Sequence, residues 1–553
     1  MSLRRAMLAP LAGALALLGA SGAGAPAQAG AVETPAQSPA VLAPTPYMGW
    51  DTYLALGPRI NESIVLTQAS RMISDGLQKA GYRYVWLDAG WWQGQRNSKG
   101  EIAVDPAQWP HGMEWLASTL HKAGFLVGLY TDAGKEGCGG VKQGSYGHYQ
   151  QDANTFAAWG FDAVKVDFCG GGDMHLSPAE AYGAFHQALL HNASHRPMLL
   201  SICDFREPGQ SPGEPPYEES AFTSYTFGPS DGNSWRTDTD VGFPDIVSFP
   251  EVLRNLDADA AHPEAAGPGH WNDPDYLAPD QGLSGAQFKT QLSMWAMVAA
   301  PLMVSDNLTT ISPASLRALK NSEVLAIDQD PAGVQGRLLS TSGEGQVWVK
   351  PLYGGQRAVA LLNVGSKAQR ISTTAAAIGM PPAAGYQLRN LWSHTTRDAS
   401  GTISAEVPGE SVVLLRVAAV SAKTAKLTRA ASRGRALAAS ASAKATTHSH
   451  GLSLSLSVNP DTARPGAPVT VSLVAHARSV NGAFGDSVSF GDGTSTPPVA
   501  LPQYCLGGNA PAGSRTWHYT HRYRKHGTYK ISASAYVNCS GEHATVSLTV
   551  HVE

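Results

Sequence analysis

A unit that recurs every 31–44 residues constrains this chain more than any other feature of its sequence. Each unit is a short apolar run that ends at or near an aspartate, followed by a stretch with helical periodicity. The eight aspartates are Asp51, Asp88, Asp132, Asp167, Asp204, Asp240, Asp275 and Asp306. One acid at a strand end could be a turn former or a helix cap. Eight in register predict a (β/α)8 barrel with its acids at the active-site end of the strands.

The pattern of apolar and polar residues changes after the eighth unit, so several domains are expected. Residues 331–418 contain short alternating runs separated by glycine-rich turns, which predict an antiparallel β-sandwich. Residues 419–451 are rich in Ala, Ser, Lys and Arg and predict a disordered linker. Alternating strands return over 452–553, which we expect to form an Ig-like β-sandwich. The barrel then occupies 30–330.

The first 29 residues have the form of a secretory signal peptide. A basic start, MSLRR, precedes the apolar run AMLAPLAGALALLGA, and Ala27-Gln28-Ala29 fits the small-residue cleavage pattern. A membrane anchor is the weaker interpretation because this apolar run is short and rich in Gly and Ala. The apolar segment 291–305 is expected to be a buried helix and strand. We therefore expect a secreted protein with no membrane partner.

Cysteine usage agrees with an extracellular location. Two of the five cysteines, Cys505 and Cys539, lie in the last domain and are expected to pair with each other. Cys138 and Cys169 both follow strand-like segments of the barrel, which leaves Cys203 over.

Charge and motif content exclude several classes of function. The formal net charge is −4 and charged residues make up 15% of the chain, so bulk charge gives no case for nucleic-acid binding. The sequence contains neither a metal-ligand cluster nor a P-loop ending, and neither a metal nor a cofactor is expected. Thirteen Trp and eighteen Tyr provide flat surfaces that suit sugar rings, although ordinary cores use them as well.

Two of the strand-end acids form a candidate catalytic pair. Asp167 follows an apolar strand together with Lys165, and Asp240 belongs to the sixth unit. The plain alternative for Lys165 and Asp167 is an ion pair at a strand end. Glycoside hydrolysis commonly uses two carboxyl groups, one that attacks the anomeric carbon and one that protonates the leaving oxygen. Lys165 is expected to keep Asp167 ionised, and Asp240 would need a raised pKa to act as the acid.

The motifs of the barrel resemble those of glycoside hydrolase family 27, the α-galactosidase family. They occur in the family's order across residues 44–330 and continue into its C-terminal sandwich. The matching segments are PYMGW (46–50), LDAGWW (87–92), GLYTDAG (128–134), KVDFC (165–169), SWRTDTD (234–240), AGPGHWNDPDYL (266–277), APLMVSDNL (300–308) and IDQDPAG (327–333).

This resemblance implies a role for each matching residue. Asp167 is the nucleophile, Asp240 is the acid/base, and Lys165 contacts ring hydroxyls of the sugar. Asp88 is expected near O4 and O6. The remaining implied positions are Arg236 and Asp204 on the 2-OH side, Tyr130, Asp275 and Tyr53 in the pocket, and a Cys138–Cys169 disulfide beside the nucleophile.

The chain departs from the family pattern at several positions. Ala89 stands where the family has a second acid, which removes a partner for the O4 hydroxyl that distinguishes galactose. Tyr53 replaces Trp, and Asp204 replaces Glu. Gly232 stands where some members have the partner of the third cysteine, so Cys203 is expected to be a free thiol that fills space in the pocket wall.

The segments FGDGT and HRYRKHGTY in the last domain resemble the polycystic-kidney-disease (PKD) domain family, although the usual aromatic residue before FGDG is missing. Such a domain could contact a polymer or a cell surface.

These observations favour a retaining exo-glycosidase that removes terminal α-galactosyl residues from oligo- or polysaccharides. A β-L-arabinopyranosidase or an α-1,6-glucan hydrolase would keep the mechanism and change the sugar. A non-catalytic sugar-binding protein is the third alternative, and the presence of both Asp167 and Asp240 argues against it.

Overall fold

The computed structural model describes residues 41–138, 142–204, 223–242, 247–420, 443–449, 451–478, 484–496, 512–537 and 542–553. The chain divides into two compact units. The first comprises the chain up to Leu338 with two short returns, Lys350–Tyr353 and Glu410–Val412. The second holds the remaining residues of the C-terminal part.

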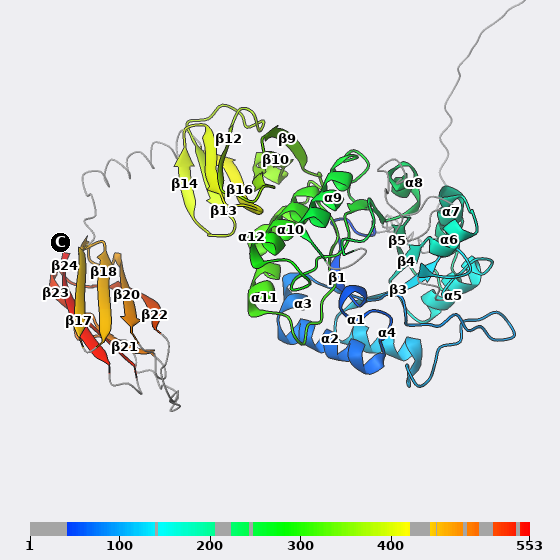
Figure 1. Cartoon of the computed structure of the whole chain (residues 1–553), viewed down its shortest axis with the longest axis horizontal. Coiled ribbons are helices and arrows are strands. Elements are labelled where there is room, and N and C mark those ends of the chain that lie inside the picture. Colours follow the sequence, from blue (N-terminus) through cyan, green and yellow to red (C-terminus); the bar gives the residue numbers. More distant parts are fainter. Residues whose placement is uncertain are drawn as a thin grey trace, which may run out of the picture. The chain divides into compact units, whose positions relative to one another are not determined.

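The first unit is built on an eight-stranded parallel sheet (Figure 1). Its order is β7-β6-β5-β4-β3-β2-β1-β8, so β1 pairs with both β2 and β8. A parallel bridge between Leu277, just after β7, and Val304 of β8 joins the two ends of the sheet. The strands are β1 (Met48–Asp51), β2 (Tyr84–Leu87), β3 (Leu126–Asp132), β4 (Ala163–Asp167), β5 (Leu199–Cys203), β6 (Ser234–Arg236), β7 (Trp271–Asp273) and β8 (Leu302–Val304).

The prediction of a TIM-like barrel with acids at the strand ends is confirmed. Each of the eight predicted aspartates lies at the last residue of its strand or within four residues after it. In register, Asp132 of β3 pairs with Asp167 of β4, and Asp167 pairs with Cys203 of β5. Because all strands are parallel, their carboxyl ends meet on one face.

Helices connect consecutive strands, as expected for this fold. They are α1 (Tyr53–Leu56), α2 (Glu62–Ser74), α3 (Leu77–Ala80), α4 (Gly112–Lys122), α5 (Tyr149–Ala158), α6 (Cys169–Asp173), α7 (Pro178–Leu190), α8 (Ser224–Asp231), α9 (Phe249–Ala260), α10 (Gly285–Val298), α11 (Pro313–Leu319) and α12 (Ser322–Asp328). Sequence signals set their starts: α9 and α10 begin with capping boxes, Ser248 with Glu251 and Ser284 with Gln287.

The apolar segment 291–305 forms most of α10 and the strand β8, as predicted. Its helical side chains from Leu292 to Val298 are all buried in the first unit. Across the described ranges, no helix has both the length and the apolar character that a membrane span requires.

An antiparallel sandwich follows the barrel in sequence, as predicted. A six-stranded sheet in the order β14-β13-β16-β11-β10-β9 and a two-stranded sheet of β12 and β15 share one apolar core. The strands are β9 (Arg337–Ser342), β10 (Gly345–Pro351), β11 (Arg357–Asn363), β12 (Gln369–Thr374), β13 (Tyr386–Asn390), β14 (Thr396–Ala399), β15 (Thr402–Val407) and β16 (Ser411–Ala419), with a 3-10 turn at Tyr353–Gly355.

The last part of the chain forms two four-stranded sheets around a separate core. Their orders are β17-β18-β20-β22 and β19-β24-β23-β21. The strands are β17 (Ala443–Ser449), β18 (Leu452–Asn459), β19 (Thr462–Ala463), β20 (Pro468–Ala477), β21 (Phe484–Ser489), β22 (Gly513–Arg522), β23 (Gly527–Val537) and β24 (His543–Val552).

One predicted boundary needs correction here. Strand β17 lies inside the range 419–451 that was assigned to a disordered linker, and it pairs with β18 along its whole length. The alternation of small and polar side chains in β17 carries little apolar signal, so its strand character depends on its partner. Residues 421–442 of the expected linker, together with Cys505 and Cys539, lie outside the described residues.

Candidate active site

Strand β4 carries the first half of the candidate active site. Side chains alternate along a strand, so Lys165 and Asp167 share one face while Val164 and Val166 occupy the other and are fully buried. Lys165 Nζ lies 2.8 Å from Asp88 Oδ2 and 3.6 Å from Asp167 Oδ1. Burial favours the neutral amine, but Asp167 and Asp88 outweigh burial and raise the pKa of Lys165 well above its ordinary value. Lys165 therefore stays charged between two carboxylates.

Asp167 is buried, with 6% of its side chain exposed. Its Oδ2 lies 3.2 Å from Cys138 Sγ, and its Oδ1 has no hydrogen-bond partner among the described residues. Burial raises the pKa of Asp167, while Lys165 and the thiol of Cys203 pull it down. The net pKa is raised, so Lys165 moderates the effect of burial without cancelling it.

The segment after the nucleophile is fixed by the predicted disulfide and by Asp132. Cys138 and Cys169 are bonded, with a Cα–Cα distance of 5.0 Å. The buried carboxylate of Asp132 accepts hydrogen bonds from the backbone N–H groups of Gly134, Gly170 and Gly171. A Cβ on Gly134 would lie 2.0 Å from the carbonyl carbon of Gly170, so this approach requires glycine.

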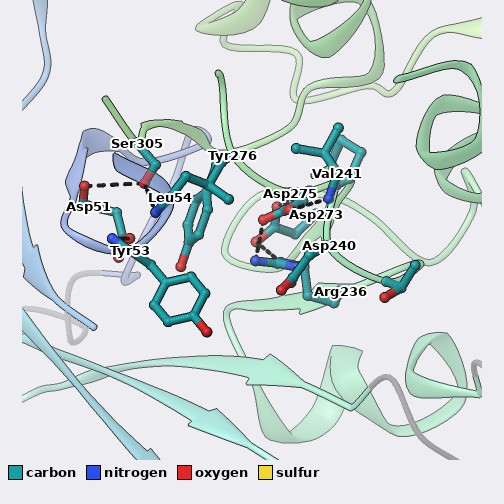
Figure 2. Close-up of polar contacts among 12 residues, drawn as sticks. Asp51, Tyr53, Leu54, Arg236, Asp240, Val241, Asp273, Asp275, Tyr276 and Ser305 are labelled. Carbon is teal, nitrogen blue, oxygen red and sulfur yellow. Dashed lines mark hydrogen bonds and ion pairs between the residues drawn. The ribbon is translucent and has the colours of Figure 1, made fainter. Parts of the chain in front are cut away.

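Arg236 organises the second half of the site (Figure 2). Its guanidinium lies 2.8 Å from Asp240 Oδ1, forms an ion pair with Asp275, and lies 3.9 Å from Asp273 Oδ2. The side chain of Arg236 is 2% exposed, whereas that of Asp240 is 27% exposed. One deeply buried cation therefore faces three carboxylates at the ends of β6 and β7.

The surroundings of Asp240 do not supply the raised pKa that its acid role would need. Burial alone would raise the pKa of Asp240, but Arg236, Lys165 and Arg254 together hold it below its ordinary value. The sequence pattern placed Arg236 four residues before Asp240, and this spacing brings them into a hydrogen bond of 2.8 Å. Such a bond favours the ionised form of the acid.

Asp275 is placed by an unusual backbone conformation. Its φ of 82° lies in the left-handed region, and its Oδ2 accepts a 2.6 Å hydrogen bond from the backbone N–H of Val241. Burial raises the pKa of Asp275 to about 7, although Arg236 opposes this effect. Asp275 thus links the end of β7 to the loop that carries Asp240.

Tyrosine rings surround the charged groups. Lys165 Nζ lies 6.0 Å from the ring centroid of Tyr53 and 5.5 Å from that of Tyr130. The Tyr130 hydroxyl accepts a hydrogen bond from the backbone N–H of Cys138. Burial and the negative charges of Asp88, Asp240 and Asp167 raise the pKa of the Tyr53 hydroxyl to about 12. Tyr53 therefore lies between the two halves of the site.

The structure brings the predicted site residues together at the expected end of the barrel. Lys165 and Arg236, from the two halves, line the same pocket. Asp204 follows β5 and is 3% exposed, next to a segment outside the described residues. Cys203 is buried and free, as predicted, and its thiol lowers the pKa of Asp167.

Three residues of the site were missed by sequence reasoning, namely Asp51, Asp273 and Tyr276. Asp51 and Tyr276 border the same pocket as Lys165, and Asp273 approaches Arg236. Asp51 was recognised as a strand-end acid but given no role. Tyr276 follows Asp275 directly, and simple alternation would point neighbouring side chains in opposite directions.

Comparison with known proteins agrees with this geometry. Residues 56–330 match the family model described as "Alpha galactosidase A", and residues 342–417 match "Alpha galactosidase C-terminal beta sandwich domain". A "Probable alpha-galactosidase" of Dictyostelium discoideum is 38% identical over 376 residues, which cover 67% of this chain and 90% of that protein.

Solved structures give the same result. The crystal structure of α-galactosidase I from Mortierella vinacea is similar with a TM-score of 0.60 and 28% identity, covering 69% of this chain and 99% of that one. The α-galactosidase of Saccharomyces cerevisiae with raffinose has a TM-score of 0.60 and 25% identity, covering 68% and 98%. The chain therefore belongs to the α-galactosidase family, glycoside hydrolase family 27, and is a glycoside hydrolase of the α-galactosidase type.

Proposed function

We propose that this chain is a retaining exo-glycosidase that releases terminal α-D-galactosyl residues from oligo- or polysaccharides. The observation that carries this proposal is the pair Asp167, the last residue of β4, and Asp240, four residues after β6, with one cation held beside each. Family membership supports the sugar, since the relatives described above are named α-galactosidases.

In the first step of the proposed reaction, the Asp167 carboxylate attacks the anomeric carbon. The bond to the leaving oxygen breaks, and Asp240 gives its proton to that oxygen. A water molecule then gives a proton to Asp240 and attacks the same carbon, which releases Asp167. Two inversions at one carbon retain its configuration. The oxygen of Asp167 nearest Lys165 has no hydrogen bond among the described residues, which suits it to attack.

The other site residues hold the sugar. Lys165 and Asp88 offer a donor and an acceptor for ring hydroxyls on the β2–β4 side. Arg236, with Asp204, serves the hydroxyl next to the anomeric carbon. Tyr53 and Tyr130 form flat walls near Lys165.

Ala89 favours a second candidate for the sugar. This buried residue offers a methyl group at the end of β2, beside the Asp88 carboxylate that binds its backbone N–H. A wall with one carboxylate fewer discriminates less against a pyranose that differs from galactose around C4 and C5. A β-L-arabinopyranoside is such a substrate.

The terminal regions suggest where the enzyme acts. The basic and apolar start of the chain supports secretion, and a disulfide in the barrel agrees with an oxidising compartment. For the last domain, its separate core supports an accessory role, such as contact of a PKD-like module with a polymer or a cell surface.

A panel of nitrophenyl glycosides tests the proposed function. We expect kcat/KM to be highest on α-galactoside, with β-L-arabinopyranoside next and α-glucoside lowest. Proton NMR of the first-formed sugar should show the configuration of the substrate, and early inversion would refute the two-step scheme. A chain that ends before residue 443 should keep its kcat/KM on these small substrates.

A further inference from the structure

Three groups, one within β4 and two just after β2 and β7, form a closed triangle of hydrogen bonds at the pocket. The Tyr276 hydroxyl donates to Asp88 Oδ2 at 2.8 Å, and Lys165 Nζ donates to the same oxygen at 2.8 Å. Lys165 Nζ also lies 3.1 Å from the Tyr276 oxygen, to which it donates. Tyr276 is 7% exposed and Asp88 is 1% exposed, so the triangle is shielded from bulk water.

The hydrogen bonds leave little freedom to Asp88. Its Oδ1 accepts a 2.6 Å hydrogen bond from the backbone N–H of Ala89, and its Oδ2 accepts the two just described. Because the Tyr276 hydroxyl and Lys165 Nζ both donate to Oδ2, both side chains restrain the orientation of this carboxylate. The Ala89 side chain adds no polar group to this wall, whereas the Tyr276 hydroxyl is a neutral side-chain donor to Asp88.

Backbone geometry explains how Tyr276 reaches this position. Asp275 and Tyr276 are consecutive, yet Asp275 contacts Arg236 while Tyr276 contacts Asp88. The left-handed φ of 82° at Asp275 breaks the alternation of a strand, so Asp275 can contact Arg236 while Tyr276 lines the pocket. The Tyr276 ring lies between the Asp51–Tyr53 region and the Arg236–Asp240 region (Figure 2). The Arg236 guanidinium carbon and Lys165 Nζ lie 4.9 Å and 5.4 Å from its centroid.

We propose that Tyr276 is a positioning residue for sugar recognition: it orients Asp88 and Lys165 toward the sugar hydroxyls and thereby tunes which pyranose the pocket accepts. This inference rests on the proposed glycosidase function. In this proposal, the Tyr276 hydroxyl has part of the role in sugar recognition that a second acid at position 89 would have. A neutral donor that acts through Asp88 adds no negative charge to a wall that already contains Asp51 and Asp88.

Tyr276→Phe tests the proposal because it removes the hydroxyl and keeps the ring. We expect kcat/KM on the sugar that the wild type prefers to fall by about 10-fold to about 150-fold, as for loss of one charged hydrogen bond. Most of the loss should be in KM. Calorimetry should show a matching loss of affinity for the free sugar, which is bound without turnover. Tyr82→Phe is the matched control. Tyr82 lies before the start of β2, and its hydroxyl donates a hydrogen bond to Leu319 O. This variant should leave both kcat/KM and the affinity for the sugar unchanged.

A double-mutant cycle with Asp88→Asn identifies the route of the effect. If Tyr276 acts through Asp88, Tyr276→Phe should cost much less in the Asp88→Asn background than in the wild type. Fully additive losses, or an unchanged affinity for the sugar in Tyr276→Phe, would overturn the proposal. Tyr276→Met, which also removes the ring, repeats the test if Tyr276→Phe is unstable to heat. A wild type that cleaves no glycoside in the panel would instead refute the proposed function.

Discussion

The two halves of the pocket use the same chemistry to opposite effect. Around Asp167, one cation, Lys165, is shared among the buried carboxylates Asp88 and Asp167, and the pKa of Asp167 is raised. Around Asp240, Arg236 is bonded directly to the carboxylate, Arg254 is nearby, and the pKa is lowered. Exposure follows the same division, at 6% for the Asp167 side chain and 27% for that of Asp240.

The difference agrees with two local features: Asp240 has a direct 2.8 Å hydrogen bond to its cation, whereas Lys165 approaches Asp167 only to 3.6 Å, and Asp240 is the less buried of the two. The pKa of Asp167 is shifted upward and that of Asp240 downward. The reactive arrangement needs an ionised Asp167 and a protonated Asp240. We therefore expect a reversed order of the two pKa values, in which this arrangement is the minor form of the singly protonated pair. The apparent pKa values of a rate profile belong to the pair as a whole.

The largest expected effect tests the nucleophilic half. Asp167→Ala should abolish turnover of the preferred glycoside because no oxygen remains to attack the anomeric carbon. Added azide should restore release of the nitrophenol and give a glycosyl azide of inverted configuration, detectable by mass spectrometry and NMR. The control is Asp306→Asn, since Asp306 is also a strand-end acid but bonds Gln281 and the backbone of Asn307. Normal turnover by Asp167→Ala would show that Asp167 is not the nucleophile, and the two halves would then not differ in the roles proposed for them.

Asp240→Ala should have the next largest effect, and its size should depend on the leaving group. Loss of a general acid typically costs about 10²–10⁴-fold in kcat/KM for a poor leaving group such as a sugar alcohol. A dinitrophenyl glycoside needs little protonation, so its first step should be nearly unaffected in stopped-flow measurements. An equal loss on both substrates would contradict the acid/base role.

A smaller change at Arg254 tests the reversed order of the two pKa values. Arg254 lowers the pKa of Asp240 and donates a 2.9 Å hydrogen bond to its backbone oxygen. Arg254→Gln should raise the pKa of Asp240. If Asp240 is the group that loses its proton first, the acidic limb of the kcat/KM profile moves to higher pH and the maximum rises. Arg254→Lys keeps the charge and serves as control. If only the basic limb moves, the pKa of Asp240 is higher than that of Asp167, which is the ordinary order of the two values.

The smallest expected effect comes from Cys203. Its thiol lowers the pKa of Asp167, so Cys203→Ala should raise it. With the reversed order, the basic limb of kcat/KM moves to higher pH and the maximum falls, because less of the pair is in the reactive form. Cys203→Ser retains a polar hydrogen and should stay near the wild type. A profile of Cys203→Ala that overlays the wild type would show that the thiol is only a filler.

Much of the fold could be predicted because its signals are local and repeated. The apolar runs and following acids located all eight barrel strands, since a short buried strand has to be apolar and its polar end has to be at the surface or in a site. The sandwich after the barrel was predicted from alternation for a similar reason. Strand β17 was missed because its sequence, AKATTHS, resembles a linker and becomes a strand through its pairing with β18.

The sequence by itself determined which chemical groups are present and which strand ends carry them: Asp88, Lys165 and Asp167 on one side, Arg236 and Asp240 on the other. The tertiary structure alone decided how these groups share protons and which neighbours orient them. The pKa order of Asp167 and Asp240 depends on distances between strands, and the role of Tyr276 depends on the left-handed turn at Asp275. Electrostatic energies change steeply with distance and burial, and neither quantity is encoded by spacing along the chain.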